Sequence, residues 1–241
     1  MIAIVMTYYN RNEQLLKTLE SFKQYDPESF RVVIVDDGSE EDIKLPDTRF
    51  EVVVLKTYRK TWMQGDPAFN LGFYYALLKY PEIVIIQNAE CYHVGDILGY
   101  ARRVTNKTYV SFGCYSQSKN GSEIYNKGAS FGGESAWYNH PEYRPKGYHF
   151  CSAITANNLI KMNGFDERFS FGAGYDDDYL LHQIKCMGLK MEITADPYVI
   201  HQWHEANKIY DDSLYKNNET IYKELIKENN YRAEHLLTTN L

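Results

Sequence analysis

Residues 2–22, IAIVMTYYNRNEQLLKTLESF, join a short apolar run to an amphipathic segment. Residues 2–6 are continuously apolar, which is typical of a strand buried on both faces. Asn10 and Glu13 then have the spacing of a capping box at the start of a helix. Behind them, apolar residues recur at helical spacing at Leu15, Leu16, Leu19 and Phe22. The stretch therefore predicts a strand followed directly by a helix.

The same alternation continues along the first half of the chain. Further apolar runs occupy residues 32–35, 52–55 and 83–86. Before the last of these, Asp66 and Pro67 predict an N-cap and a first-turn proline for another helix. The pattern predicts an α/β fold with a mainly parallel sheet and helices on both faces. Ligands of such sheets bind beyond the carboxyl ends of the strands, so polar residues after each strand are the candidates for function.

The second half of the chain carries fewer regular signals. Thr155 predicts the cap of a short helix that ends before Gly164, and residues 198–202 predict a late strand. Residues 117–147 are rich in Gly, Ser, Asn and Tyr, which is typical of a functional or disordered loop. The glycine-rich residues 128–133 within it do not open a β-α-β unit, so they predict no dinucleotide loop.

Composition excludes several classes of protein. The chain has 241 residues, a formal net charge of −6 and a pI near 5.7, which argues against binding to nucleic acid. No apolar run approaches the roughly 20 residues of a transmembrane helix, and the N-terminus lacks the basic region of a signal peptide. The four cysteines are widely spaced, which predicts free thiols without a zinc site or disulfide. We therefore expect a cytoplasmic protein.

An acidic segment stands out at residues 165–180, FDERFSFGAGYDDDYL. The apolar periodicity that follows predicts a helix, so Asp176, Asp177 and Asp178 fall in its first turn. The helix dipole favours ionised side chains there. Helix capping alone would account for one of them. Three together behind two glycines indicate a candidate general base.

Three post-strand clusters accompany this segment: Thr7-Tyr8-Tyr9-Asn10, Asp36-Asp37-Gly38-Ser39 and Asn88-Ala89-Glu90. Together with residues 165–167 and 174–178, they resemble nucleotide-sugar glycosyltransferases of the family 2 type, which have the GT-A fold. The later half also resembles the galactosyltransferase pattern Gly-Phe-Asp-Glu followed by Glu-Asp-Asp-Asp. The resemblance implies a GT-A domain over residues 1–205, with a nucleotide-binding half at 1–90 and an acceptor and catalytic half at 91–205. Residues 206–241 would form a helical extension.

The resemblance assigns the nucleotide to the first two clusters. Thr7, Tyr9 and Asp37 would contact the base and ribose, because a carboxylate can accept from a pyrimidine N–H and a tyrosine ring can stack. Asp36 would either join them or shape the turn, and the whole cluster could alternatively be an Asx-type turn. Arg11 and Asn70 complete the expected nucleotide-binding set.

A divalent ion, Mn²⁺ or Mg²⁺, is the cofactor that the resemblance implies. The usual Asp-x-Asp is replaced by Asn88-Ala89-Glu90, in which Glu90 can still bind directly and Asn88 offers a carbonyl oxygen. A histidine near the end of the fold, His201 or His204, would add a ligand. On a strand these two point to opposite faces, so only one should reach the ion. Without an ion, compensating cations would be needed, and Arg11, Arg59 and Lys60 are the candidates.

The catalytic base implied by the resemblance is Asp176, with Asp177 as the alternative, although Tyr175 departs from the pattern. The expected sugar and acceptor residues are Trp137, His140, His149 and Asp166, and core packing under a loop is the alternative role of the aromatic ones. The expected activity is inverting transfer of a sugar from a UDP-linked donor to a hydroxyl of a glycan or other acceptor. Two alternatives stay open: a sugar-phosphate nucleotidyltransferase, and a catalytically inactive module of the same fold that binds a sugar or a nucleotide sugar.

Overall fold

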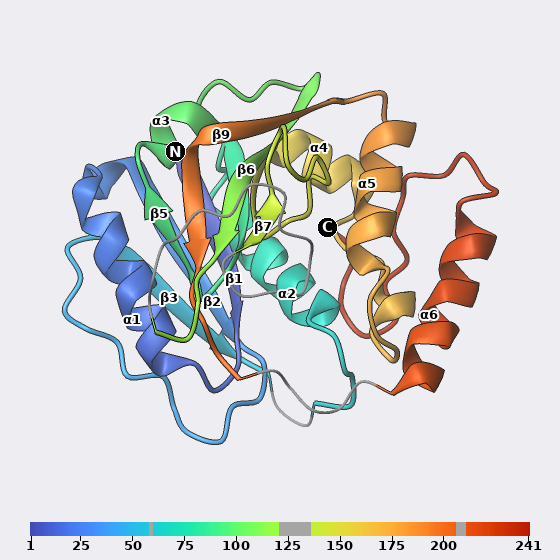
Figure 1. Cartoon of the computed structure of the whole chain (residues 1–241), viewed down its shortest axis with the longest axis horizontal. Coiled ribbons are helices and arrows are strands. Elements are labelled where there is room, and N and C mark those ends of the chain that lie inside the picture. The colour runs from blue at the N-terminus through green and yellow to red at the C-terminus, as the bar shows by residue number, and fades with distance from the viewer. Residues whose placement is uncertain (58–59, 121–135, 206–210) are drawn as a thin grey trace.

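In a computed structural model of the chain, which describes residues 1–57, 60–120, 136–205 and 211–241, strands and helices build a layered α/β fold (Figure 1). The strands are β1 (Ile2–Tyr8), β2 (Phe30–Asp36), β3 (Glu51–Lys56), β4 (Ile83–Asn88), β5 (Cys91–Val94), β6 (Thr108–Ser116), β7 (Ala136–Asn139), β8 (Cys151–Thr155) and β9 (Lys190–His201). The α-helices are α1 (Asn12–Ser21), α2 (Asp66–Leu77), α3 (Ile97–Ala101), α4 (Ala156–Met162), α5 (Asp176–Cys186) and α6 (Asp212–Leu225). Short 3₁₀ helices are η1 (Phe22–Gln24), η2 (Pro27–Ser29) and η3 (Glu167–Phe169).

One sheet runs through the molecule in the order β3-β2-β1-β4-β8-β6-β9-β5, with β7 paired to β6. The first four strands in this order are parallel to one another. Beyond them, β8 joins β4 and β6 in antiparallel fashion, and β6 pairs parallel to β9. The predicted α/β sheet with helices on both faces is confirmed. The second half of the chain carried fewer sequence signals, and its strands join the sheet in both parallel and antiparallel pairs.

Alternating residues of the central strands enter two separate cores. Ile2, Ile4 and Met6 pack on the side that holds α1 and α3. Ala3 and Val5 pack on the opposite side with α2, α4 and α5. A continuously apolar strand is what such double coverage requires. Gly72 brings α2 against the sheet, since a Cβ there would lie 2.6 Å from a Val5 methyl group.

Two helix starts differ from the sequence prediction. α1 begins at Asn12, and no side chain caps it. Asn10 has a left-handed φ of 50°, and its side chain accepts from the Glu40 N–H, so it ties down the next loop instead of forming a capping box. α2 begins at Asp66 with Gly65 at the N-cap. The cap of α4 by Thr155 is confirmed.

The loop before α2 and the loop before α5 are bound to each other. The N–H groups of Met63 and Gln64 donate to the Ser170 carbonyl, at 2.7 and 3.1 Å. The Gln64 side chain also accepts from the Gly174 N–H. These bonds bring the N-termini of α2 and α5 together at one place.

α6 is fixed against the same loop and lies beyond α5 in Figure 1. The buried Asn218 donates to the carbonyls of Phe169 and Gly174, both at 2.9 Å. No helix among the described residues is long and apolar enough to cross a membrane. The four cysteines are free, as predicted, and Cys186 is less buried than the other three.

Candidate active site

The strand register brings the predicted nucleotide-binding residues to one edge of the sheet. Thr7 lies between Val35 of β2 and Asn88 of β4. Asp37 follows β2 directly, and its N–H donates to the Tyr8 carbonyl at 2.8 Å. The prediction that these post-strand residues share one edge is confirmed.

Asp36 and Asp37 have different surroundings. Asp36 Oδ1 accepts from the Ser39 N–H at 2.8 Å, so it shapes the turn, as one alternative from the sequence proposed. Asp37 Oδ2 lies 2.5 Å from Lys60 Nζ, and Oδ1 accepts from Trp62 Nε1 at 2.9 Å. Burial raises the pKa of Asp37, and these two donors oppose that rise. Both Asp37 oxygens therefore have protein partners.

An exposed ring lies beside this pair. Tyr9 is 38% exposed, and Lys60 Nζ lies 5.1 Å from its ring centroid. A ring so placed offers a face for a planar group. Arg59 and residues 128–133 lie outside the described residues.

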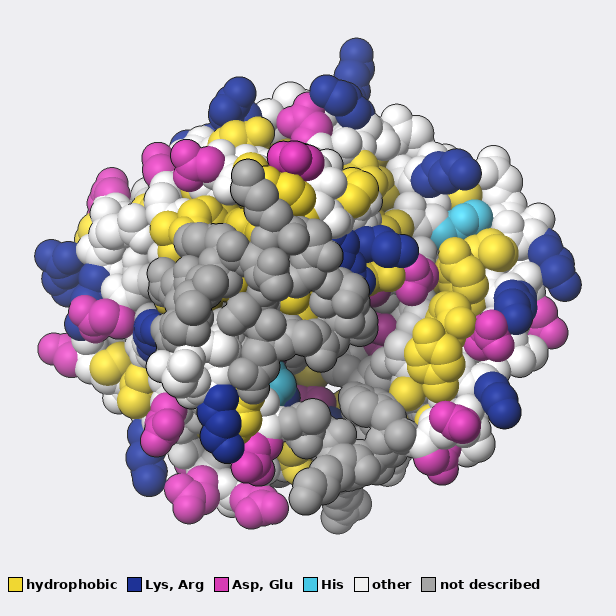
Figure 2. All heavy atoms as spheres, viewed as in Figure 1, with side chains coloured by type: hydrophobic (Ala, Val, Ile, Leu, Met, Phe, Trp, Pro, Cys, Tyr) yellow, Lys and Arg dark blue, Asp and Glu magenta, His cyan; other side chains and the backbone are white. Residues whose placement is uncertain are grey.

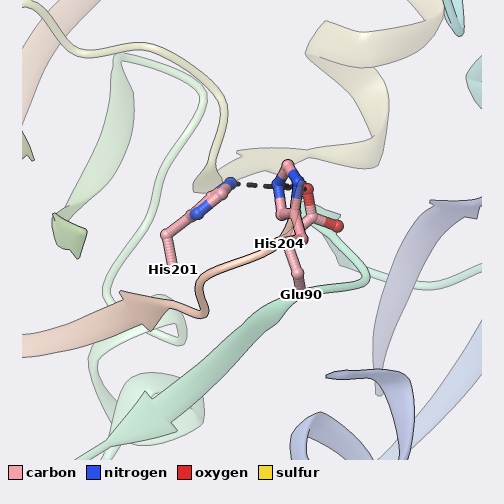
Figure 3. A group of neighbouring side chains, drawn as sticks. All are labelled: Glu90, His201 and His204. Atoms are coloured by element: carbon pink, nitrogen blue, oxygen red, sulfur yellow. Dashed lines mark ion pairs between the residues drawn. The ribbon is translucent and has the colours of Figure 1, made fainter. Parts of the chain in front are cut away.

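A carboxylate and two imidazoles meet at the ends of β4 and β9 (Figure 3). Glu90 Oε1 lies 3.4 Å from His201 Nε2 and 3.6 Å from His204 Nε2. The potential ligand atoms of the three residues all lie within 4.8 Å of one another. One carboxylate oxygen and two imidazole nitrogens fit a first-row transition ion such as Mn²⁺.

The expectation that only one histidine would reach this point is wrong. β9 ends at His201, and the next residue, Gln202, turns the chain because its N–H and side-chain amide both donate to the Glu90 carbonyl at 3.0 Å. Opposite facing of neighbouring side chains holds only within a strand. His204 lies past the strand end, so it faces Glu90 together with His201.

Arg11 completes this cluster. Its Nη1 lies 2.5 Å from the same Glu90 Oε1. Burial alone would raise the pKa of Glu90, but the hydrogen bond from His201 and the charge of Arg11 lower it to about 2. Burial and Arg11 lower the pKa of His204. Glu90 is therefore an ionised carboxylate.

The three consecutive aspartates at the start of α5 are not equivalent. Asp177 Oδ1 lies 2.6 Å from His149 Nδ1 and also accepts from the His149 N–H at 3.1 Å. Asp178 Oδ1 accepts from the Tyr148 hydroxyl at 3.0 Å. Asp176 is half-buried, and its carboxylate accepts from the backbone N–H groups of Asp176 and Asp177 but from no side chain among the described residues.

The electrostatic surroundings of Asp176 suit a proton acceptor. Burial and the charge of Asp177 raise the pKa of Asp176 to about 6, although the charge of His149 opposes the rise. Asp66, at the start of α2, is buried, and burial together with the charge of Asp176 raises its pKa well above the usual range. Asp66 is a site residue that the sequence reasoning read only as a helix cap. The signal that could have identified Asp66 is its place at the first residue of α2, whose N-terminus lies next to that of α5.

Asn70 and Asp166 serve the framework, in contrast to the predicted ligand contacts. The side-chain amide of the fully buried Asn70 donates to the Phe165 carbonyl and accepts from the Phe165 N–H, both at 2.9 Å. Asp166 accepts from the Arg168 guanidinium at 2.7 and 2.8 Å and from the Glu234 N–H at 3.0 Å. These bonds hold the loop before α5 in place.

The predicted acceptor residues separate into two groups. Trp137 is buried with its ring 4.4 Å from that of His140. His140 Nδ1 accepts from the N–H groups of Glu142 and Tyr143, which is the packing role. His149 instead lies against Asp177, where the acids of α5 gather.

The sheet order, the carboxylates after its strands and the Glu-His-His cluster define a GT-A type α/β fold. Residues 3–167 match the model of glycosyl transferase family 2, and the chain belongs to this family. The match ends before Asp176, so it does not cover the acidic turn, and the resemblance of that turn to galactosyltransferases stays a prediction. No curated protein sequence matches the chain.

Solved structures share the fold at low sequence identity. TarS residues 1–349 of S. aureus in complex with UDP-GlcNAc matches with a TM-score of 0.65 and 12% identity, over 93% of this chain and 66% of that one. The mannosyltransferase PcManGT of Pyrobaculum calidifontis, in complex with GDP-Man and Mn²⁺, matches with a TM-score of 0.58 and 15% identity, over 94% and 64%. The catalytic domain of Drosophila β1,4-galactosyltransferase 7, with xylobiose, matches with a TM-score of 0.54 and 14% identity, over 96% and 81%. The chain spans only 36% of TarS in another of its structures.

Proposed function

We propose that this protein is an inverting, metal-assisted glycosyltransferase that moves a sugar from a UDP-linked donor to an acceptor hydroxyl. One observation carries the proposal: Asp176 is the acid of the α5 turn that no side chain of the described residues binds, and its pKa is raised to about 6. A general base works best with a pKa near the working pH. Asp177 and Asp178 are engaged by His149 and Tyr148. They frame the base and do not replace it.

The donor lies along the edge formed by β1, β2 and β4. Tyr9 stacks on the base, Asp37 accepts its ring N–H, and Thr7 lies beneath the ribose. Glu90, His201 and His204 would hold an ion, and Asn88 would offer a carbonyl oxygen beside them. When bound, that ion offsets the negative charge that grows on the leaving diphosphate. Arg11 and Lys60 supply further positive charge at the phosphates.

The reaction is a direct displacement. Asp176 takes the proton of the acceptor hydroxyl while its oxygen attacks the anomeric carbon of the donor sugar. The bond to the diphosphate breaks on the opposite face, which gives inversion. Attack from one face requires the acceptor to lie on the α5 side of the sugar.

Aromatic residues of α6 give the acceptor a surface beside this base. The Tyr175 ring lies 5.0 Å from that of Tyr215 and 5.3 Å from that of Tyr222. Tyr215 is 52% exposed. In Figure 2 a stripe of side chains of the hydrophobic class, which includes tyrosine, runs along the region where α5 and α6 lie side by side. Flat apolar rings suit the C–H faces of a pyranose, so we assign a sugar unit of the acceptor to these tyrosines.

The test is a panel of nucleotide sugars assayed for released nucleoside diphosphate. The wild-type protein should release UDP from at least one UDP-sugar, whereas Asp176→Asn should release far less with unchanged UDP affinity. Formation of a nucleoside triphosphate and a sugar 1-phosphate, when pyrophosphate is added to the nucleotide sugar, would instead identify a nucleotidyltransferase.

An inactive donor-binding module is the second candidate. Asn88 in place of an acid and the Arg11 contact on Glu90 favour it, because both weaken an ion site. Such a module would bind UDP in calorimetry and yet release no UDP from any donor, with or without Mn²⁺.

A further inference from the structure

Glu90 Oε1 is contacted by three nitrogen-bearing side chains from distant parts of the chain. Arg11 Nη1 is the nearest, at 2.5 Å, while the two histidine nitrogens lie at 3.4 and 3.6 Å. Glu90 is buried, with 7% of its side chain exposed, and Arg11 is 21% exposed. A guanidinium therefore occupies the oxygen that the two imidazoles converge upon.

Arg11 and a divalent ion exclude each other from this oxygen. A carboxylate oxygen binds such an ion at about 2.0–2.2 Å. The Arg11 nitrogen lies 2.5 Å from the same oxygen, so the guanidinium and the ion would compete for one atom. Two cations in such contact repel strongly in a partly buried site. Ion binding at Glu90, His201 and His204 therefore requires the Arg11 side chain to move away.

The structure also supplies a destination for Arg11. Arg11 follows Thr7 and Tyr9 on the loop after β1, beside the proposed donor site. A guanidinium binds phosphate oxygens through two parallel hydrogen bonds. Lys60 is held in the same way on Asp37, at 2.5 Å, so two proposed phosphate-binding cations rest on carboxylates of the site.

We propose that Arg11 is a positioning residue that closes Glu90 to the ion until the donor arrives. The diphosphate would then bind the guanidinium, and Glu90, once released, could hold the ion together with His201 and His204. Ion and donor binding are thereby coupled through one side chain. The donor half of this inference rests on the proposed function, whereas the competition between Arg11 and the ion does not.

The experiment is a Mn²⁺ titration of the purified protein without donor. Electron paramagnetic resonance measures the free ion at each step. Arg11→Met keeps most of the side-chain length and removes the charge. It should bind Mn²⁺ at least tenfold more tightly than the wild type. The matched control is Arg103→Met, because Arg103 is exposed and packs over the Tyr100 ring, 4.6 Å from its centroid. This control should bind like the wild type.

Two further variants make the result specific. Arg11→Gln can still donate to Glu90 without a charge, so it should show the same gain and replaces Arg11→Met if that protein fails to fold. His201→Ala in the Arg11→Met background should remove the gain, which locates the ion at this cluster. Equal or weaker Mn²⁺ binding in both Arg11 variants would overturn the competition.

Titration in the presence of UDP tests the coupling. UDP should raise the Mn²⁺ affinity of the wild type by a larger factor than that of Arg11→Met, because the variant has no contact to release. Equal enhancement in both proteins would overturn the coupling. Failure of the proposed function is distinguishable: it would appear as absent UDP release from every donor, while the donor-free titration would still report on Arg11.

Discussion

His149 Nδ1 lies 2.6 Å from Asp177 Oδ1, and this contact separates the roles of two adjacent carboxylates. Asp177 is paired with His149, whose ring makes T-shaped contacts with the stacked rings of Phe69 and Phe165. Asp176, one residue earlier, has no side-chain partner among the described residues, so its carboxylate is placed to accept a proton from a substrate. A turn with three acids in sequence thus contains one candidate base and a rigid support.

The base assignment predicts unequal effects of two matched substitutions. Asp176→Asn keeps the size of the side chain and removes the proton acceptor, so sugar transfer should fall by ~10²–10⁴. Asp177→Asn retains an oxygen for the His149 N–H, so transfer should fall much less. Transfer rates at saturating donor measure both, and UDP calorimetry shows that the site is intact. A larger loss in Asp177→Asn would move the base by one residue.

The pH dependence follows from the raised pKa of Asp176. Its carboxyl must be ionised to accept a proton, and its pKa is about 6, so kcat should fall as the pH drops below about 6. Asp177 and Asp176 raise the pKa of His149 against the effect of burial, which keeps His149 charged at this pH. That positive charge lowers the pKa of Asp176.

His149→Gln should therefore raise the pKa of Asp176 and move the acidic limb of the kcat profile to higher pH. The glutamine amide can still donate to Asp177, which limits the structural change. A rate profile between pH 5 and 8 measures the shift. An acidic limb that stays in place in His149→Gln would show that His149 does not act on the base.

Much of the fold was predictable because its signals are local. Residues 2–6 have the continuous apolar character of a strand covered on both faces, and Thr155 caps its own helix. The site edge followed from the same logic, since parallel strands end at one edge. The partners within the site were not predictable. Lys60 on Asp37 and Arg11 on Glu90 join residues 23 and 79 positions apart, and no local pattern encodes such pairs.

The two histidines show the limit of periodicity. His201 and His204 lie three positions apart, so a continued strand would have placed them on opposite faces. The end of β9 depends on the bonds from Gln202 to the Glu90 carbonyl, which join residues 112 positions apart. A contact so distant in sequence decided that both imidazoles face one carboxylate.

The Glu90 cluster predicts a preference among divalent ions. Two imidazole nitrogens favour a first-row transition ion, whereas Mg²⁺ prefers oxygen ligands. UDP release should therefore be supported better by Mn²⁺ than by Mg²⁺ at equal concentration. Asn88→Asp adds an anionic oxygen and should increase Mn²⁺ affinity several-fold, measured by titration in the presence of UDP. Full activity after exhaustive chelation, with no further increase on adding either ion, would exclude a metal role.

The tyrosines of α6 predict where acceptor affinity resides. Tyr215 is 52% exposed and its ring lies 5.0 Å from that of Tyr175, directly before the proposed base. Tyr215→Ala removes one face of this surface and leaves the Asn218 bonds that hold α6 in place. The acceptor KM should rise roughly five- to tenfold, which matches about 1–1.4 kcal/mol for one aromatic contact. The donor KM and slow hydrolysis of the donor by water should not change, because neither requires the acceptor.

Tyr231→Ala is the matched control, since Tyr231 is 40% exposed and belongs to a different segment. Initial rates over a matrix of donor and acceptor concentrations separate the two KM values. An unchanged acceptor KM in Tyr215→Ala, or an equal rise in Tyr231→Ala, would place the acceptor elsewhere.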